Sequence, residues 1–316
     1  VPVEGIGPLT PEACKTLVYP LFTEPQREMF ENNKEIDFSY EHANKSRFRI
    51  NAYTQLGRVS AALRLLNSEI PTIDQLRLPA VFHQITHMRQ GFVLVTGPTG
   101  HGKSTSLAAM IEEINQSRSE HVITIEDPIE YVYKAKKSII SQRELQHDTH
   151  SWEMALRSAL REDPDIVLVG EMRDYETIAA ALTIAETGHL VFATLHTNSA
   201  AQTVDRIIDV FPENQQPQVR NQLASSLEAV FAQRLIPYLN GPRIPVVEVM
   251  LASSAVRNTI REGKTHQINN IIQTSGTLGM MTFEASLAYW VKSGVIGLEV
   301  AKEYALRPDE LMRAMK

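Results

Sequence analysis

Hydrophobic and polar positions alternate between Ser46 and Tyr53 with a period of two, which is typical of a half-buried β-strand. A turn near Leu56 and a second run from Arg58 to Leu66 extend this strand into a predicted hairpin. Upstream, Pro11–Val18 and Pro25–Asn33 are predicted to form two short helices. Together these elements predict a small α+β domain.

From about residue 80 the pattern changes to short continuous apolar runs separated by helical stretches. Buried strands that alternate with helices are typical of a parallel sheet covered on both faces. The expected strands are Phe92–Thr96, Val122–Glu126, Ile166–Gly170 and Leu190–Leu195, and the expected helices are Ser104–Asn115, Trp152–Arg161 and Tyr175–Thr187. Beyond Phe211 the pattern is mostly helical, with one further strand around Pro245–Met250.

Length and composition agree with a two-domain globular protein. The chain has 316 residues, of which 43% are hydrophobic and 22% charged. We expect one domain in residues 1–68, a linker in residues 69–79 and a larger domain in residues 80–316. The chain begins with Val1 rather than Met, so we also expect a cut or processed start.

Charge and cysteine content exclude several classes of function. The net charge of −6 provides no global basic field for nucleic acid. No apolar run approaches the roughly 18–20 residues of a membrane span, and no signal peptide is visible. The single cysteine, Cys14, can form neither an intramolecular disulfide nor a cysteine-rich zinc site, so a reducing cytoplasmic setting is expected.

A glycine-rich loop lies between the first expected strand and helix of the larger domain. It matches the pattern G-x-x-x-x-G-K-[ST] at every fixed position. Such a loop turns consecutive N–H groups toward one anion, its lysine reaches the β- and γ-phosphates, and its hydroxyl can bind Mg²⁺. The expected nucleotide-binding residues are Gly97, Pro98, Thr99, Gly100, His101, Gly102, Lys103, Ser104 and Thr105.

Two other expected strands end in carboxylates. Glu171 follows Gly170, which stands where many P-loop enzymes carry a Mg²⁺-binding aspartate, and Glu126 ends the strand that begins at Val122. Carboxylates at these strand ends lie near the nucleotide crevice and can orient water or bind Mg²⁺. The cluster Glu126, Asp127 and Glu130 favours a shared Mg²⁺, although an exposed acidic turn fits it nearly as well.

Two histidines bracket the last strand of this set. His189 precedes Leu190, and His196 follows Leu195. Their spacing does not suit a shared metal, and each alone fits a structural role. Both nevertheless lie at strand ends, where a side chain can sense a phosphate.

Several motifs together resemble those of the secretion and pilus ATPases, and within them the type IV pilus retraction ATPases. The phosphate loop resembles their Walker A motif, Ile123–Glu130 their Asp box, Arg161–Arg173 their Walker B motif, and Thr187–Thr197 their His box. Ala255–Glu262 resembles a motif of retraction motors, with Val256 and Thr259 as departures. The resemblance extends from about Leu9 to Met315. Residues 255–262 fit two interpretations equally well. They form either a plain amphipathic helix that packs in the C-terminal bundle or a segment that couples the nucleotide state to a partner.

The resemblance implies a homohexamer that binds ATP at subunit boundaries. Each subunit would combine a small α+β PAS-like N-terminal domain with an α/β core of the RecA-like P-loop NTPase fold and a helical C-terminal region. The family has a further strand before the segment that matches Leu9, so we expect the small domain to lack an edge strand here.

The resemblance also implies roles for individual residues. Arg49 and Arg64 match arginine fingers, a role that suits a permanently charged, forked guanidinium. Glu126 and Glu171 match two hydrolytic glutamates, and which of them is the base stays open. Ser104, Glu126 and Glu171 are the expected Mg²⁺ ligands, partly through water. His196 is an expected catalytic residue, and His189 an expected nucleotide contact.

The implied function is ATP-driven retraction of type IV pili at the inner face of the cytoplasmic membrane, with an inner-membrane pilus platform protein as partner. A pilus assembly or type II secretion ATPase is the nearest alternative, but assembly motors commonly carry a tetracysteine zinc module. A nucleic-acid translocase conflicts with the acidic charge. A non-hydrolysing scaffold conflicts with the presence of Lys103, Glu126 and Glu171.

Overall fold

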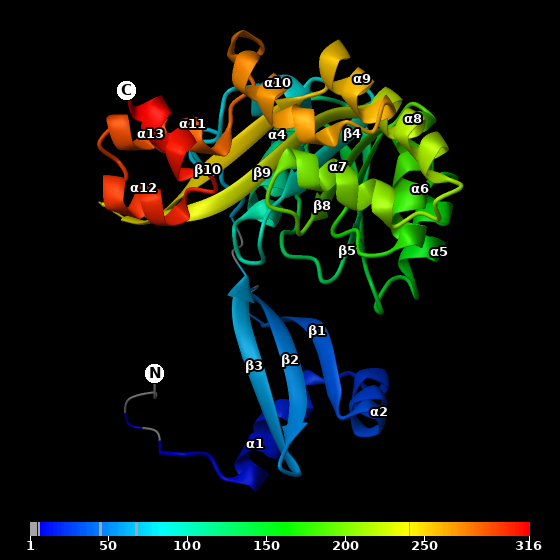
Figure 1. Ribbon diagram of the computed structural model, residues 1–316. Helices are drawn as coiled ribbons and strands as arrows, with labels where there is room; N and C mark the ends of the chain where they lie inside the picture. The colour runs from blue at the N-terminus through cyan, green and yellow to red at the C-terminus, as the bar shows by residue number, and fades with distance from the viewer. Residues whose placement is uncertain (1–4, 6, 44–45, 67–68, 240) are drawn as a thin grey trace. The chain divides into compact units, whose positions relative to one another are not determined.

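A computed structural model describes residues 5, 7–43, 46–66, 69–239 and 241–316. The chain forms two compact units, and Figure 1 shows the elements of each. Val1–Glu69 and Pro128–Val132 make up the first, while Ile70–Asp127 and Tyr133–Lys316 make up the second. Residue 68, the expected end of the small domain, lies outside the described residues.

The first unit packs its helices against one face of a three-stranded antiparallel sheet with the order β1-β2-β3. Val18 and Phe30 of the helices and Ile50 and Ala52 of the central strand are buried together in its core. The elements are α1 (Pro11–Val18), η1 (Tyr19–Leu21), α2 (Glu24–Asn33), β1 (Glu35–Glu41), β2 (Arg47–Gln55) and β3 (Arg58–Leu66).

The structure confirms both predicted helices and the predicted hairpin of the first unit. Strand β1 was not predicted, although a signal for it is present. Ile36, Phe38 and Tyr40 alternate with polar residues, and the first two are buried while Glu35 and Asp37 are exposed. This is the period of a half-buried strand.

The second unit is built on a seven-stranded sheet. Its elements up to the last parallel strand are α3 (Val81–Thr86), β4 (Gly91–Thr96), α4 (Lys103–Ser117), β5 (His121–Glu126), β6 (Ile139–Glu144), α5 (Trp152–Ala159), β7 (Ile166–Val169), α6 (Tyr175–Glu186), β8 (Leu190–Leu195), α7 (Ala200–Asp209), α8 (Gln216–Ser226) and β9 (Leu227–Tyr238). Then follow β10 (Gly241–Leu251), α9 (Ser254–Arg261), η2 (Thr265–Gln267), α10 (Ile268–Thr274), η3 (Gly276–Leu278), α11 (Phe283–Lys292), α12 (Leu298–Tyr304) and α13 (Pro308–Met315).

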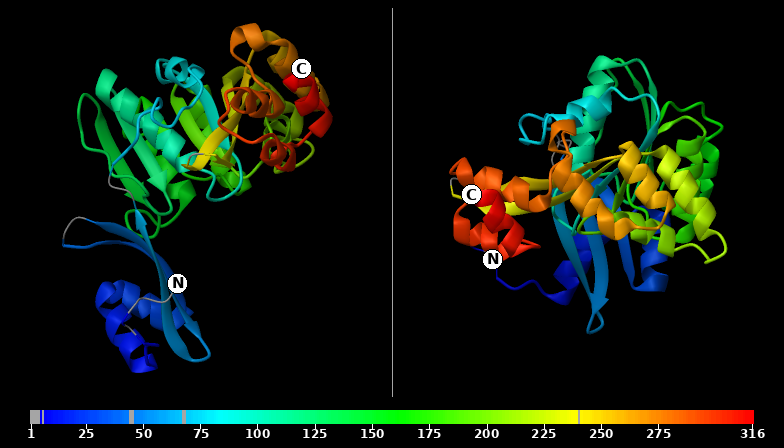
Figure 2. Two further views of the ribbon diagram at one scale, coloured as in Figure 1. Left: turned by 90° about the vertical axis from the view of Figure 1, so that its left-hand side faces the viewer. Right: turned by 45° about the horizontal axis from the view of Figure 1, so that its top comes forward.

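The strand order of this sheet is β10-β9-β4-β8-β7-β5-β6, and only β9 and β10 pair antiparallel. Side chains of α5 to α10 form one apolar core with the sheet. Helices α3 and α4 pack on the opposite face, where Phe82 stacks on Phe231 with ring centroids 4.0 Å apart. Figure 2 shows helices on both sides of the strands, so the predicted α/β fold is confirmed.

The far ends of β9 and β10 leave this core and pack with the C-terminal helices α11 to α13. Strand β9 was not predicted, because the helical pattern expected beyond Phe211 covered it. Its Leu, Glu, Ala and Gln residues favour a helix locally, but the positions between β4 and β10 require a strand, and tertiary packing decides. The edge strand β6 was also missed.

The segment that resembles the retraction motif forms helix α9, which packs firmly on the second unit. Val256, Thr259 and Ile260 are buried. Arg257 donates hydrogen bonds to the carbonyls of Ala224 and Ser225 at the end of α8 (2.8 and 3.0 Å) and pairs with Glu228 (2.8 Å). Arg257 therefore fastens α9 to α8, and a coupling role for this segment stays a prediction.

None of the helices among the described residues is long and apolar enough to cross a membrane.

A carboxyl group is buried where β10 meets the start of α7. Glu248 is 1% exposed and accepts a 2.7 Å hydrogen bond from the backbone N–H of Ala200. Burial raises the pKa of Glu248, and the nearby negative charge of Glu284 adds to the effect. The native state therefore binds the proton of the Glu248 carboxyl group more tightly than the unfolded chain does. The contribution of this group to stability is complete below its ordinary pKa of 4.5, and it is lost as pH rises through the raised pKa of the native state.

Replacement of this carboxyl group by an amide should therefore stabilise the protein in a pH-dependent way. Glu248→Gln keeps the acceptor for Ala200 and removes the cost of burying a negative charge. We expect Tm to rise by about 2–4 °C at pH 8, which corresponds to about 1 kcal/mol, and to stay unchanged at pH 4. Calorimetry at both values tests this, with the exposed Glu299→Gln as control. An equal loss of Tm at both pH values would contradict the assignment.

Candidate functional site

The glycine-rich loop connects β4 to the start of α4, as predicted. Three of its glycines have a positive φ: 141° at Gly97, 77° at Gly100 and 82° at Gly102. A side chain at Gly97 would place its Cβ 2.1 Å from the carbonyl oxygen of Gln233 in β9. Both the backbone conformation and the lack of space therefore require glycine at position 97.

Lys103 begins α4 with its ammonium group turned back into the loop. It is 8% exposed and donates hydrogen bonds to the carbonyls of Gly97 (2.8 Å) and Pro98 (3.1 Å). The positive end of the helix dipole lies at the same place, next to Ser104 and Thr105. This combination of charge, dipole and N–H groups is suited to bind phosphate.

Strand β9 holds the loop from the side. The buried Gln233 donates from Nε2 to the carbonyl of His101 and accepts from the hydroxyl of Ser106, both at 2.8 Å. The N–H of Leu235 donates to Nδ1 of His101 (2.9 Å). Burial and the charge of Arg234 lower the pKa of His101, in agreement with an unprotonated Nδ1 that accepts a hydrogen bond. Gln233 was missed in the sequence because β9 was missed.

A chain of polar contacts connects the loop to the end of β7. Thr99 Oγ1 lies 3.4 Å from Nδ1 of His196, and Nε2 of His196 lies 2.7 Å from Oε1 of Glu171. Glu171 follows β7 and His196 follows β8. Because these strands are parallel neighbours, their carboxyl ends meet at one edge of the sheet. The structure thus brings two of the predicted catalytic residues together beside the loop.

Glu171 is held as an anion by two neighbours. Arg173 donates to both of its oxygens, at 2.7 and 2.8 Å, and His196 contacts Oε1. Burial alone would raise the pKa of Glu171, but the hydrogen bonds and charges of Arg173 and His196 outweigh it and lower that pKa. A fixed carboxylate at this position can orient water or bind Mg²⁺ through water.

Glu126 lies at the end of β5 and accepts a 2.7 Å hydrogen bond from the hydroxyl of Thr124. Gly170, which stands where many P-loop enzymes carry a Mg²⁺-binding aspartate, lies next to Glu126. A Cβ at Gly170 would lie 3.2 Å from both the Cα of Glu126 and the carbonyl of Ile125. Glycine therefore allows the ends of β5 and β7 to approach closely, with a carboxylate on each strand end.

The donor set fits a Mg²⁺ ion that arrives with a nucleotide. Such an ion needs only one or two carboxylates besides phosphate oxygens and water, and Ser104, Glu126 and Glu171 supply ligands of this kind. Within the described part of the chain no three His, Cys, Asp or Glu side chains form a group that could hold a metal. A shared Mg²⁺ at Glu126, Asp127 and Glu130 stays a prediction.

His189 is a correction to the predicted site. It precedes the first residue of β8, which pairs with Gly91 at the start of β4, whereas the phosphate loop follows Thr96 at the other end. Its ring contacts the carbonyl of Ile184 (3.0 Å) and the hydroxyl of Thr187 (3.1 Å). Because it lies at the opposite edge of the sheet, His189 does not contact a nucleotide bound at this loop.

Arg49 and Arg64 lie directly opposite each other in β2 and β3 of the first unit, with their side chains on the same face. Like charges in this arrangement repel and reduce stability. Asp37 lies 3.9 Å from Arg49, and Arg64 is exposed. Two guanidinium groups on one face can together bind an anion, and their contact with a phosphate stays a prediction.

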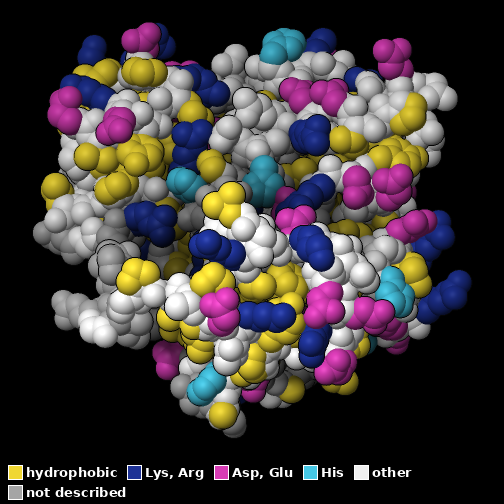
Figure 3. All heavy atoms as spheres, turned by 90° about the horizontal axis from the view of Figure 1, so that it is seen from below, with side chains coloured by type: hydrophobic (Ala, Val, Ile, Leu, Met, Phe, Trp, Pro, Cys, Tyr) yellow, Lys and Arg dark blue, Asp and Glu magenta, His cyan; other side chains and the backbone are white. Residues whose placement is uncertain are grey.

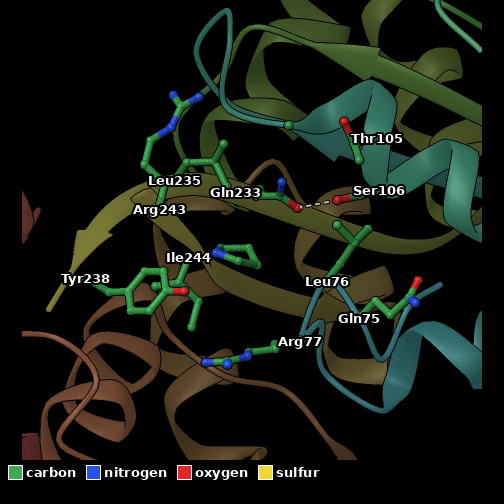
Figure 4. Close-up of a pocket in the computed structure, with 12 residues that line it drawn as sticks. Gln75, Leu76, Arg77, Thr105, Ser106, Gln233, Leu235, Tyr238, Arg243 and Ile244 are labelled. Atoms are coloured by element: carbon green, nitrogen blue, oxygen red, sulfur yellow. Dashed lines mark hydrogen bonds between the residues drawn. The ribbon is translucent and has the colours of Figure 1, made fainter. Parts of the chain in front are cut away.

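A pocket of about 390 Å³ adjoins the loop (Figure 4). It combines apolar side chains such as Leu76 and Ile244 with the guanidinium groups of Arg77 and Arg243. A mixture of this kind and size suits the base and ribose of a nucleotide. The lining comes from Gln75, Leu76, Arg77, Gly102, Thr105, Ser106, Gln233, Leu235, Tyr238, Arg243, Ile244 and Pro245. Sequence reasoning missed the first three because it assigned residues 69–79 to a linker.

Comparisons with known proteins agree with this geometry. The model of the family described as type II/IV secretion system protein matches residues 32–282. The type IV pilus retractation ATPase PilT of Pseudomonas aeruginosa is 48% identical over 305 residues, which cover 96% of this chain and 89% of that protein. A twitching motility protein of Neisseria gonorrhoeae is 48% identical over 304 residues, which cover 96% of this chain and 81% of that protein.

Among solved structures, the pilus retraction motor PilT with bound ADP superimposes with a TM-score of 0.89 at 49% sequence identity. The match covers 95% of this chain and 85% of that one.

The position of Gln233 leads to a prediction about the loop. Gln233→Leu removes two hydrogen bonds that hold the loop, each worth about 0.5–1.5 kcal/mol, so we expect affinity for a fluorescent ATP analogue to fall about tenfold. Gln222→Leu, which makes the same change on α8 and removes only a bond to Glu186, is the control. Equal affinities of Gln233→Leu and the wild type would contradict a role of β9 in holding the loop.

Proposed function

This chain belongs to the family of type II/IV secretion system proteins, and from this premise we propose that it is an ATP-hydrolysing motor that drives retraction of type IV pili. The single observation that carries the hydrolytic role is the contact chain from Thr99 through His196 to Glu171. It connects the phosphate loop to a carboxylate that is kept ionised.

The residues of the loop bind the nucleotide. Lys103 exchanges its hydrogen bonds with the carbonyls of Gly97 and Pro98 for phosphate oxygens, and the N–H groups at the start of α4 hold the same phosphates. The base and ribose occupy the adjoining pocket. Ser104, Glu126 and Glu171 would hold Mg²⁺, partly through water, and the ion would supply positive charge against the phosphates.

The residues at the strand ends activate water. Glu171 orients the attacking water, and His196 transmits the state of the γ-phosphate between Thr99 and Glu171. Release of Arg173 from one carboxylate oxygen frees that oxygen for this task. Because Arg173 is 70% exposed, the exchange costs about 1 kcal/mol or less.

The motor acts as a homohexamer with ATP at subunit boundaries. Arg49 and Arg64 of one subunit contact the γ-phosphate held by the next, and they lose this contact when phosphate leaves. Sequential changes of this kind around the ring turn an inner-membrane pilus platform protein from its cytoplasmic face. The identity to pilus retraction and twitching motility proteins over nearly the whole chain supports this reading.

A nucleic-acid translocase receives no support from the face shown in Figure 3. Figure 3 shows basic and acidic side chains interspersed over the face that it presents. A continuous basic stripe is the usual footprint of nucleic-acid binding.

Removal of the Glu171 carboxylate tests the hydrolytic role. We expect Glu171→Gln to lower kcat for phosphate release about 10²–10⁴-fold, the usual contribution of a general base, while ATP binding stays within about twofold of the wild type. The neighbouring Glu176→Gln, on the exposed start of α6, should keep wild-type kcat. If the wild type and Glu171→Gln release phosphate at the same low rate, the protein does not hydrolyse ATP through this site.

Deletion of the gene tests the direction of the motor. Cells without a retraction motor should carry excess surface pili and lose twitching motility. The wild-type gene should restore both properties, and the Glu171→Gln gene should restore neither. Cells without any surface pili would show instead that the motor assembles the filament.

A further inference from the structure

The segment Thr72–Leu78, which the sequence assigned to a linker, forms one wall of the pocket through Gln75, Leu76 and Arg77. It has a defined shape of its own. Thr72 and Gln75 exchange two hydrogen bonds of 2.8 and 3.1 Å, and the side chain of Ile73 is 1% exposed. Arg77 adopts a positive φ of 55°, a strained conformation for a residue with a side chain.

His83 of α3 connects this wall to the helix that follows the phosphate loop. Its Nδ1 lies 2.7 Å from Oε2 of Glu113 in α4, and its Nε2 lies 3.2 Å from Oδ1 of Asp74 in the wall segment. Thr86 donates a 2.6 Å hydrogen bond to the other oxygen of Glu113 and fixes that carboxylate. One imidazole ring thus bridges the residue next to Gln75 and a residue of the helix that Lys103 begins.

The bridge is strongest when the ring is charged. Burial alone would lower the pKa of His83, but its hydrogen bonds to Asp74 and Glu113 and their negative charges outweigh it and raise that pKa. These two carboxylates face the ring from the wall segment and from α4. His87 contacts the carbonyl of His83 and the hydroxyl of Thr86. Arg118 donates to the carbonyls of Thr86 and Met88 and pairs with Glu120.

We propose that His83 is a positioning residue that sets nucleotide affinity, by holding the wall Gln75–Arg77 of the pocket against the phosphate-loop helix. The proposal rests on the proposed function, because it takes the nucleotide to occupy this pocket. His83 itself touches no part of the nucleotide. Its loss therefore weakens binding and leaves the chemical step at Glu171 unchanged.

Replacement of His83 by a neutral residue separates binding from chemistry. In His83→Gln we expect the Kd for a fluorescent ATP analogue and the KM for ATP to rise about two- to fivefold at pH 6.5, with kcat unchanged, since partly exposed ion pairs contribute modestly. Asp74→Asn, on a side chain that is 86% exposed, should produce an effect of the same direction. The double variant should bind no more weakly than His83→Gln alone.

The matched control is His87→Gln, which changes the next histidine and leaves both carboxylates untouched. It should bind like the wild type. As pH rises through the raised pKa of His83, the charged bridge is lost and wild-type affinity falls toward that of His83→Gln. The difference in affinity between the two proteins should therefore disappear at high pH.

Two outcomes separate this inference from the function on which it rests. If the wild type binds the analogue and both His83→Gln and Asp74→Asn bind it equally well at pH 6.5, the bridge does not set affinity and the inference fails. A lower kcat with unchanged KM in His83→Gln would overturn it as well. If the wild type binds no nucleotide, the proposed function fails.

Discussion

The approach of Gly97 to the backbone carbonyl of Gln233 is the contact on which the nucleotide site depends. A Cβ at position 97 would lie 2.1 Å from that oxygen, so the loop reaches β9 only through glycine. Once the loop lies there, Gln233 and Leu235 hold His101, and Lys103 is directed into the loop. The position of Thr99 next to His196 follows from the same placement. One steric constraint therefore aligns the phosphate loop with the carboxylate of Glu171.

The strand ends explain which parts of this site the sequence could predict. Glu171 and His196 each follow a short apolar run, and parallel strands place such residues at one edge, so their proximity could be predicted. The same reasoning should have excluded His189, which lies at the other end of the strand that His196 follows. Gln233 could not be found, because local helix propensity concealed β9 and only its burial between β4 and β10 makes it a strand. The segment Gln75–Arg77 carries no motif, and only the folded chain shows that it borders the loop.

The ion pair of Glu171 and Arg173 positions the carboxylate through a contact that can be exchanged. Arg173 donates to both carboxylate oxygens, and its hydrogen bonds and charge favour the ionised form of Glu171. A buried pair would resist exchange by several kcal/mol, but Arg173 is 70% exposed, so its contribution is about 1 kcal/mol or less. Under the proposed function, Mg²⁺ and phosphate bring far larger charges to the same place. Arg173 thus fixes the position of the Glu171 carboxylate through a weak contact that other charges can replace.

Under the proposed function, the segment near the start of the second unit contacts the bound nucleotide. Residues 72–78 follow the first unit in the chain, and Gln75, Leu76 and Arg77 among them form a wall of the pocket. Holding such a segment in one conformation costs about 1–2 kcal/mol for each residue in backbone entropy, so every contact that orders it matters. A nucleotide that contacts this wall stabilises its position, and the effect is reciprocal. Any force that pulls the segment away from α4 must lower nucleotide affinity by the same free energy that the nucleotide contributes to holding it.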